Sequence, residues 1–352
     1  MARQFRCYDL IRHPLLYRGV YVNNFLLLLL ALFLAANAQS KIQLDYSDEN
    51  IILSTTDNNF GSNPTVIVHD DFESGAINAP LANWSLSSSH GKTPVYTNND
   101  KVTGIFSAKA DFSGGSFNST AEYKSLGGIS KVYVSYYFKV SHLSGAASRN
   151  IKLGRLSSGY QSAYIEPTGL TFFPTNENGI FYTYSNIESE SKTPTTWLDN
   201  FVDSQWHRAE YLLELSSPAG SANGKSLIIL DGIKISEKNQ IVTEELGNKI
   251  EWFTLPYYVA HDPGGDYLIF YDNVVVSKNP GRVEVCDKDT YSSCKKPTII
   301  QVSNWENDRI TIPQDRFLKG SGSNLYIFNQ SGQLLNSKGI HACPKCPKPP
   351  ET

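Results

Sequence analysis

Short runs of alternating apolar and polar residues follow one another along the chain between residues 65 and 278. The clearest run, residues 131–140, places five apolar side chains on one face, and residues 206–215 repeat the pattern. A period of two residues predicts strands that are buried on one face only. The outward side chains predicted in these two runs are Tyr133, Ser135, Tyr137, Lys139, Arg208, Glu210, Leu212 and Glu214.

Similar patterns predict further strands, and no segment of comparable length has a helical period. Strands without covering helices must pair mainly antiparallel and pack sheet on sheet. We therefore expect an all-β fold, an antiparallel two-sheet jelly-roll sandwich over residues 65–280, with a two-residue hairpin at Asp231-Gly232. The further strands are expected at residues 66–69, 105–112, 150–156, 170–173, 180–184, 226–230, 252–258 and 267–276.

The start of the chain has the pattern of an exported protein. Four Arg precede an apolar run at residues 25–34, which ends in Ala36-Asn37-Ala38. This predicts a signal peptide over residues 1–38, because the run is well short of the roughly 20 residues that span a bilayer. A retained anchor is the alternative. We expect a secreted protein, extracellular or periplasmic, without a membrane span after cleavage, and a flexible leader at residues 39–64.

The last part of the chain differs in character. Short strands around Trp305 predict a small C-terminal β extension over residues 281–341, followed by an exposed tail at residues 342–352 that is rich in Pro and Lys. Roughly 60 residues are close to the lower limit for an independent core. The extension can therefore be a separate module or a flap docked on the sandwich.

Four cysteines follow the signal region, at positions 286, 294, 343 and 346. In an exported protein they predict disulfides. The local pairing, Cys286 with Cys294 and Cys343 with Cys346, is favoured among the three possible pairings. A zinc site at Cys343-Pro-Lys-Cys346 is the alternative.

Charge narrows the range of partners. The formal net charge is −3, and it becomes −6 when residues 1–38 are removed, since they hold four Arg and one Asp. No basic block follows the signal region. This argues against a nucleic-acid partner, which needs clustered Lys and Arg.

Four strings of residues follow one another along the chain: Asp70-Asp71-Phe72-Glu73-Ser74-Gly75 with Trp84, Trp206-His207-Arg208-Ala209-Glu210, Leu230-Asp231-Gly232 and Tyr271-Asp272-Asn273-Val274. Their order resembles that found in a known superfamily. The chain resembles the concanavalin A-like lectin/glucanase superfamily, in particular secreted bacterial proteins related to jelly-roll polysaccharide lyases. Asn273 stands where a second Asp is usual. The resemblance implies a concanavalin A-like sandwich and leaves the activity open, because such sandwiches bind, hydrolyse, eliminate or adhere.

Residue types favour elimination over hydrolysis. A retaining glucanase needs two carboxylates about 5 Å apart, whereas Glu210 and Glu214 would be roughly 13 Å apart along a strand. A lyase needs a cation for the uronate carboxylate and a proton-transferring group. We expect catalytic roles for Tyr137, Lys139 and Arg208, the cations lowering the tyrosine pKa from about 10. The expected substrate-binding residues are Tyr133, Lys152, Arg155 and Glu210.

These residues also have structural interpretations. The tyrosines can be surface aromatics with cross-strand partners, and Arg208 with Glu210 can form a cross-strand ion pair. No cofactor is expected, although calcium is left open because Asp262, Asp266, Asp272 and Asn273 could supply oxygen ligands.

The sequence thus predicts a carbohydrate-active protein that binds a polysaccharide on an open outer face of the sandwich. If it is an enzyme, we expect β-elimination of a uronate-containing polymer. The alternative is a non-catalytic adhesion or structural protein of the cell surface, in which the sandwich contacts other proteins.

Overall fold

A computed structural model gives the structure of the protein and divides the chain into two compact units, Met1–Lys41 and Ile42–Thr352. The first unit lies outside the described residues, so the signal peptide stays a prediction. Among the residues described, the model has no helix that is long and apolar enough to cross a membrane. The described residues are 42–47, 49–86, 92–113, 122–145, 151–157, 169–174, 179–184, 196–198, 204–243, 247–255, 258–259, 265–313 and 323–342.

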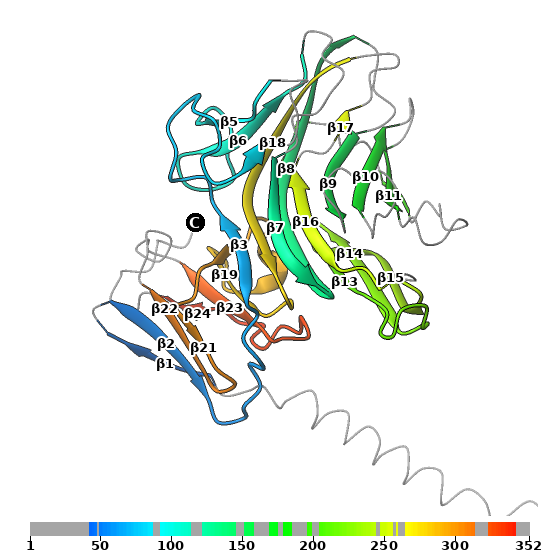
Figure 1. Ribbon diagram of the computed structural model, residues 1–352. Coiled ribbons are helices and arrows are strands. Elements are labelled where there is room, and N and C mark those ends of the chain that lie inside the picture. Colours follow the sequence, from blue (N-terminus) through cyan, green and yellow to red (C-terminus); the bar gives the residue numbers. More distant parts are fainter. Residues whose placement is uncertain are drawn as a thin grey trace, which may run out of the picture. The chain divides into compact units, whose positions relative to one another are not determined.

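Two antiparallel sheets form the main body (Figure 1). We name the first the β9 sheet; its strand order is β12-β11-β10-β9-β16-β7-β4, and β17 also pairs with β9. Its strands are β4 (Ser85–Leu86), β7 (Glu122–Ile129), β9 (Ile151–Ser157), β10 (Gly169–Pro174), β11 (Gly179–Tyr184), β12 (Thr196–Leu198), β16 (Ile250–Leu255) and β17 (Tyr258–Val259).

The second sheet, named the β8 sheet, has the order β15-β14-β13-β8-β18-β6-β5, and β3 also pairs with β18. Its two longest strands, β8 and β18, run side by side (Figure 1). Its strands are β3 (Val66–Asp70), β5 (Val95–Thr97), β6 (Ser107–Asp111), β8 (Lys131–Gly145), β13 (His207–Glu214), β14 (Gly224–Leu230), β15 (Ile233–Ile241) and β18 (Gly265–Ser277).

One hydrophobic core fills the space between these sheets, and it uses the inward residues that the alternation predicts. From β8 it takes Val132, Val134, Tyr136, Phe138 and Val140, and β13 contributes alternate residues in the same way. The predicted all-β sandwich is therefore confirmed, and each predicted strand overlaps a strand of the structure, although the strand predicted at residues 252–258 ends at Leu255.

The hairpin is also confirmed. Asp231 and Gly232 join β14 to β15 with positive φ angles of 49° and 76°, which a two-residue type I′ turn requires.

Strands from both ends of the second unit build two smaller sheets, which we call the terminal module. The sheet orders are β1-β2-β22-β21 and β20-β19-β23-β24, and all pairs are antiparallel. A 3₁₀ helix, Tyr291–Ser293, follows β19. The strands are β1 (Ile42–Tyr46), β2 (Asn50–Thr55), β19 (Arg282–Cys286), β20 (Thr298–Ile300), β21 (Asn304–Trp305), β22 (Arg309–Pro313), β23 (Asn324–Phe328) and β24 (Ile340–His341).

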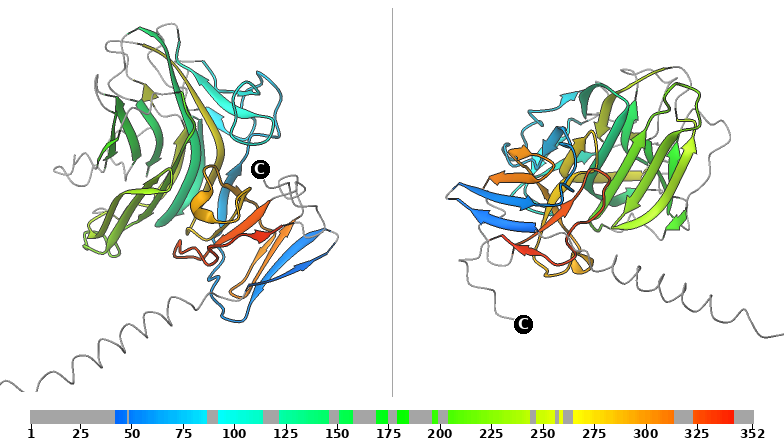
Figure 2. Two further views of the ribbon diagram at one scale, coloured as in Figure 1. Left: turned by 180° about the vertical axis from the view of Figure 1, so that it is seen from behind. Right: turned by 90° about the horizontal axis from the view of Figure 1, so that it is seen from below.

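The prediction of a flexible leader at residues 39–64 is wrong for the part that the structure describes. Ile51 and Leu53 of β2 are buried in a second core together with Phe60. In Figure 2 the blue strands β1 and β2 lie beside the orange strand β22, with Ile51 opposite Ile312. The apolar run at residues 51–53 is too short to predict a strand by itself. Its partner strand comes from the other end of the chain, so the sequence around it gives no sign of the pairing.

The extension at residues 281–341 shares this core with β1 and β2, so it is neither a separate module nor a simple flap. Ala342, placed in the predicted tail, is 4% exposed and belongs to the same core. The predicted Cys286–Cys294 disulfide is present. Cys343 and Cys346 lie outside the described residues.

Candidate functional site

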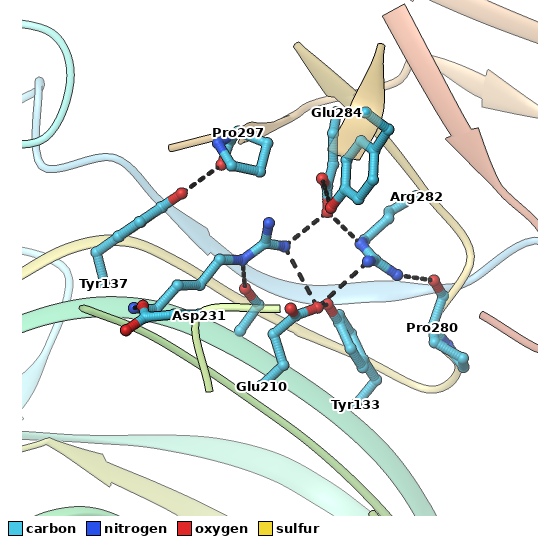
Figure 3. A network of polar contacts seen from close by, with 11 residues as sticks. Tyr133, Tyr137, Glu210, Asp231, Pro280, Arg282, Glu284 and Pro297 are labelled. Atoms are coloured by element: carbon cyan, nitrogen blue, oxygen red, sulfur yellow. Dashed lines mark hydrogen bonds and ion pairs between the residues drawn. The ribbon is translucent and has the colours of Figure 1, made fainter. Parts of the chain in front are cut away.

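Two arginines and two glutamates are buried together where β19 meets the outer face of the β8 sheet (Figure 3). Arg208 Nη2 lies 2.6 Å from Glu284 Oε1 and 3.4 Å from Glu210 Oε1. Arg282 approaches the same oxygens, Nη2 at 3.2 Å from Glu210 and Nε at 2.5 Å from Glu284. All four side chains are at most 8% exposed, so each charge has its compensating partners inside the protein.

Tyrosine hydroxyls complete this network. Tyr133 donates to Glu210 Oε1 at 2.5 Å, and Tyr291 of the 3₁₀ helix donates to Glu284 Oε2 at 2.7 Å. Tyr137 donates to the carbonyl of Pro297 at 2.7 Å. Burial raises the pKa of Tyr133, Tyr137 and Tyr291 above the usual value. Burial also opposes the charge of Glu284, but the neighbouring arginines outweigh it and lower the pKa of Glu284 to about 2.

The prediction that Tyr133, Tyr137, Arg208 and Glu210 lie on an open face is therefore wrong. They do share the outer face of the β8 sheet, but each is at most 4% exposed because β19, β20 and the 3₁₀ helix cover them. The raised pKa of Tyr137 also opposes its predicted role in proton transfer. The structure assigns this face to contact with the terminal module, and the structural interpretation of Arg208 and Glu210 as an ion pair fits it.

Lys139 lies farther along β8 on the same face. Its ammonium pairs with Asp100, whose other carboxylate oxygen accepts a hydrogen bond from Trp206 Nε1 at 2.7 Å. The lysine also lies 5.9 Å from the centre of the Phe270 ring. These contacts place Lys139 in a local cluster, apart from the predicted partners Tyr137 and Arg208.

Arg155, in contrast, lies on the β9 sheet. It is 6% exposed, and it follows the strand alternation onto the outer face, because its neighbour Leu156 is in the core. Across the strand pair, Arg155 is opposite Thr254 of β16, and Ser157 is opposite the partly exposed Trp252. Residues that are diagonal on adjacent antiparallel strands are about 7–8 Å apart. Trp252 and Arg155 are therefore neighbours on one face.

The backbone register brings further positions to this region. Lys152 of β9 is opposite Tyr258 of β17, and Thr254 is opposite Tyr123 of β7. The sequence analysis named Lys152 and Arg155 as candidate site residues, but it did not name Trp252 or Tyr258. The alternation within residues 252–258 could have identified Trp252 as an outward aromatic residue, but its place beside Arg155 depends on strand pairing.

The acidic residues of the recognised strings bind the protein's own backbone and indole groups. Asp70 accepts hydrogen bonds from Phe72 N and Trp84 Nε1, both at 2.8 Å. Glu73 accepts from the amides of residues 105 and 106 at 2.7 and 2.9 Å. Asp272 accepts from the amides of residues 102, 103 and 273, and burial raises its pKa to about 7. These carboxylates hold loops in place.

The calcium ligands considered from the sequence do not assemble into a site in the described part of the chain. Asp266 accepts a hydrogen bond from Ser144 at an exposed position, six residues along β18 from Asp272, and Asp262 lies outside the described residues. The residues described contain no group of three or more His, Cys, Asp or Glu that could hold a metal ion.

A cavity of about 340 Å³ lies beside the buried network, at the junction of the β8 sheet and the terminal module. Its lining includes His69, Tyr133 and Arg282. Arg282 is already engaged by Glu210, Glu284 and the carbonyl of Pro280. The positive charge of Arg282 beside this cavity is therefore already compensated within the protein.

The chain has distant structural neighbours among solved proteins. No family model matches the chain, and no curated protein matches it. Among solved structures, an endo-β-1,4-glucuronan lyase from the fungus Trichoderma reesei is 14% identical, with a TM-score of 0.43, and the match covers 61% of this chain and 96% of that one. An alginate lyase from Chlorella virus is 16% identical over 61% of this chain and all of its own, with a TM-score of 0.42.

The cellulose-induced protein Cip1 is 12% identical over 60% of this chain and 97% of its own, also with a TM-score of 0.42. At such identities the likeness concerns the sandwich alone.

Proposed function

We propose that the protein binds a polysaccharide bearing carboxylate groups on the outer face of the β9 sheet. The main support is the diagonal placement of Arg155 and Trp252 on β9 and β16. An indole can stack on a sugar ring, and a guanidinium can pair with a carboxylate through two parallel hydrogen bonds. The pair combines an aromatic platform with a carboxylate-binding group.

The burial of Arg155 supports a charged ligand over a neutral one. Because only 6% of Arg155 is exposed, a ligand carboxylate would reach its guanidinium only at the part that lies at the surface, where pairing is stronger than in open water. Lys152, three residues earlier on β9, adds a second basic position. On the outer face of the β8 sheet, Arg208 is engaged by Glu210 and Glu284.

Binding is tested with the purified full-length chain on immobilised alginate, glucuronan, pectate, glycosaminoglycans and a neutral glucan. We expect retention on at least one uronate polymer, and Arg155→Ala should weaken it about tenfold or more, because a charge-assisted hydrogen bond contributes about 1.5–3 kcal/mol. Lys234→Ala is the control, since Lys234 lies on β15 with a 59% exposed side chain. Equal losses in both variants, or no retention of the wild type, would refute the proposal.

As a reaction we propose elimination, in which a base removes the proton from C5 of a uronate, a double bond forms between C4 and C5, and the bond from C4 to the leaving oxygen breaks as that oxygen takes up a proton. Hydrolysis by Glu210 is disfavoured because its carboxylate is engaged in the buried network. Tyr258, opposite Lys152 in the backbone register, is the position to change first.

Elimination produces an unsaturated uronate that absorbs in the ultraviolet. We expect Tyr258→Phe to abolish the increase in absorbance and Tyr137→Phe to leave it unchanged; a wild-type trace that stays flat would refute elimination.

A further inference from the structure

A β-bulge interrupts β9 next to Arg155. In the register of β9 with β10, Gly154 is opposite Leu170 and Lys152 is opposite Thr171, so Leu153 is the extra residue. An extra residue leaves backbone groups outside the ladder of hydrogen bonds. Leu153 is fully buried, and its carbonyl therefore needs a partner within the protein.

Tyr271 of β18, in the opposite sheet, supplies this partner. Its hydroxyl donates to the carbonyl oxygen of Leu153 at 2.8 Å across the core. Tyr271 is 2% exposed, and burial raises its pKa, so the hydroxyl keeps its proton and stays a donor at neutral pH. The bulge in one sheet is thereby fixed by a side chain of the other.

Gly154 lies against two more tyrosines of the β8 sheet. A Cβ atom there would lie 2.7 Å from the hydroxyl oxygen of Tyr136 and 3.0 Å from that of Tyr211. These two rings pack edge to face, with centres 6.1 Å apart, and both are buried. Only glycine fits between β9 and these hydroxyls, which restricts the residue that can follow the bulge.

The position of the bulge decides where Arg155 lies. Side chains alternate along a strand, so moving the extra residue past Arg155 would turn its side chain to the other face of the sheet. That face is the apolar core, where an arginine would be strongly disfavoured. Leu153, whose carbonyl is held from inside, is only two residues away.

We infer that Tyr271 is a positioning residue, which holds the bulge at Leu153 and thereby keeps Arg155 on the outer face of the β9 sheet. The role of Arg155 in binding a ligand rests on the proposed function. The hold of Tyr271 on the bulge does not, and it is measured separately.

The test compares Tyr271→Phe with Tyr96→Phe in the full-length chain. Both changes keep the ring and remove one buried hydroxyl from the same core, but the Tyr96 hydroxyl accepts a hydrogen bond from Ala82 N, away from β9. Hydrogen exchange followed by mass spectrometry reports on residues 151–157. We expect Tyr271→Phe to speed exchange there about three- to tenfold, as loss of one net hydrogen bond predicts, and Tyr96→Phe to leave it unchanged. Equal exchange in both variants would overturn the inference.

Affinity for the retained uronate polymer gives a second readout that general destabilisation would not reproduce. Tyr271→Phe should weaken binding severalfold when Arg155 is present and have little effect in the Arg155→Ala background, because the two changes act through one interaction. A full effect in both backgrounds would overturn the link to Arg155. Faster exchange in β9 with no binding by the wild type would uphold the role of Tyr271 in the bulge and refute the proposed function alone.

Discussion

Glu284 accepts bonds from Arg208, Arg282 and Tyr291, so three segments of the chain meet at one carboxylate. Removing one member of such a buried group leaves the others without compensation, which costs about 3–5 kcal/mol. The carboxylates of Asp70, Glu73 and Asp272 act in a similar way on loops. At the scale of single residues, most buried acidic groups described above serve the fold.

Glu284→Gln should lower the free energy of unfolding by about 3–5 kcal/mol at neutral pH. The folded-state pKa of Glu284, about 2, lies below the unfolded value of about 4.3. Its contribution is therefore complete above pH of about 4.3 and is lost as the pH falls towards 2. Urea unfolding over this range should show a smaller loss of stability in Glu284→Gln than in the wild type.

The matched control is Glu214→Gln, which removes a partly exposed ion pair with Lys131 at 2.8 Å. A surface pair contributes about 1 kcal/mol at most. If both substitutions have the same small effect, the buried network does not stabilise the docking of β19 on the β8 sheet.

At the scale of elements, β2 differs most from its sequence prediction. Its burial pattern alternates in the way that defines a half-buried strand, yet the run is short and polar residues follow it. The alternation in β8 is longer and continues without a break over residues 131–140, which is why that strand could be predicted. Strand pairing over a long sequence separation leaves no local signal.

Leu53→Ala tests the assignment of β2. Leu53 is fully buried in the second core, and truncating such a side chain costs about 2–5 kcal/mol. Ile105→Ala, at a position 58% exposed, should change the stability by less than about 0.5 kcal/mol. If Leu53→Ala left the stability unchanged, residues 42–55 would behave as the leader that the sequence suggested.

At the scale of the whole molecule, the terminal module covers one outer face of the sandwich, that of the β8 sheet. The sequence did contain a signal for this, because Arg282-Val283-Glu284 repeats the Arg-x-Glu spacing of Arg208-Ala209-Glu210. Two strands with paired opposite charges on alternate residues can face one another, as they do here. The sandwich could be predicted from the local alternation of apolar and polar residues. The covered face and the placement of Trp252 beside Arg155 could not, because they depend on which strands pair.

We propose the outer face of the β9 sheet as the face that binds the ligand. The most direct measurement is hydrogen exchange of the full-length chain with and without saturating oligosaccharide of the uronate polymer that it retains. We expect slower exchange in residues 151–157 and 250–259, around Arg155 and Trp252, and unchanged exchange in residues 131–139 and 207–214. Protection confined to the latter segments of the β8 sheet, or protection of neither sheet, would contradict the account.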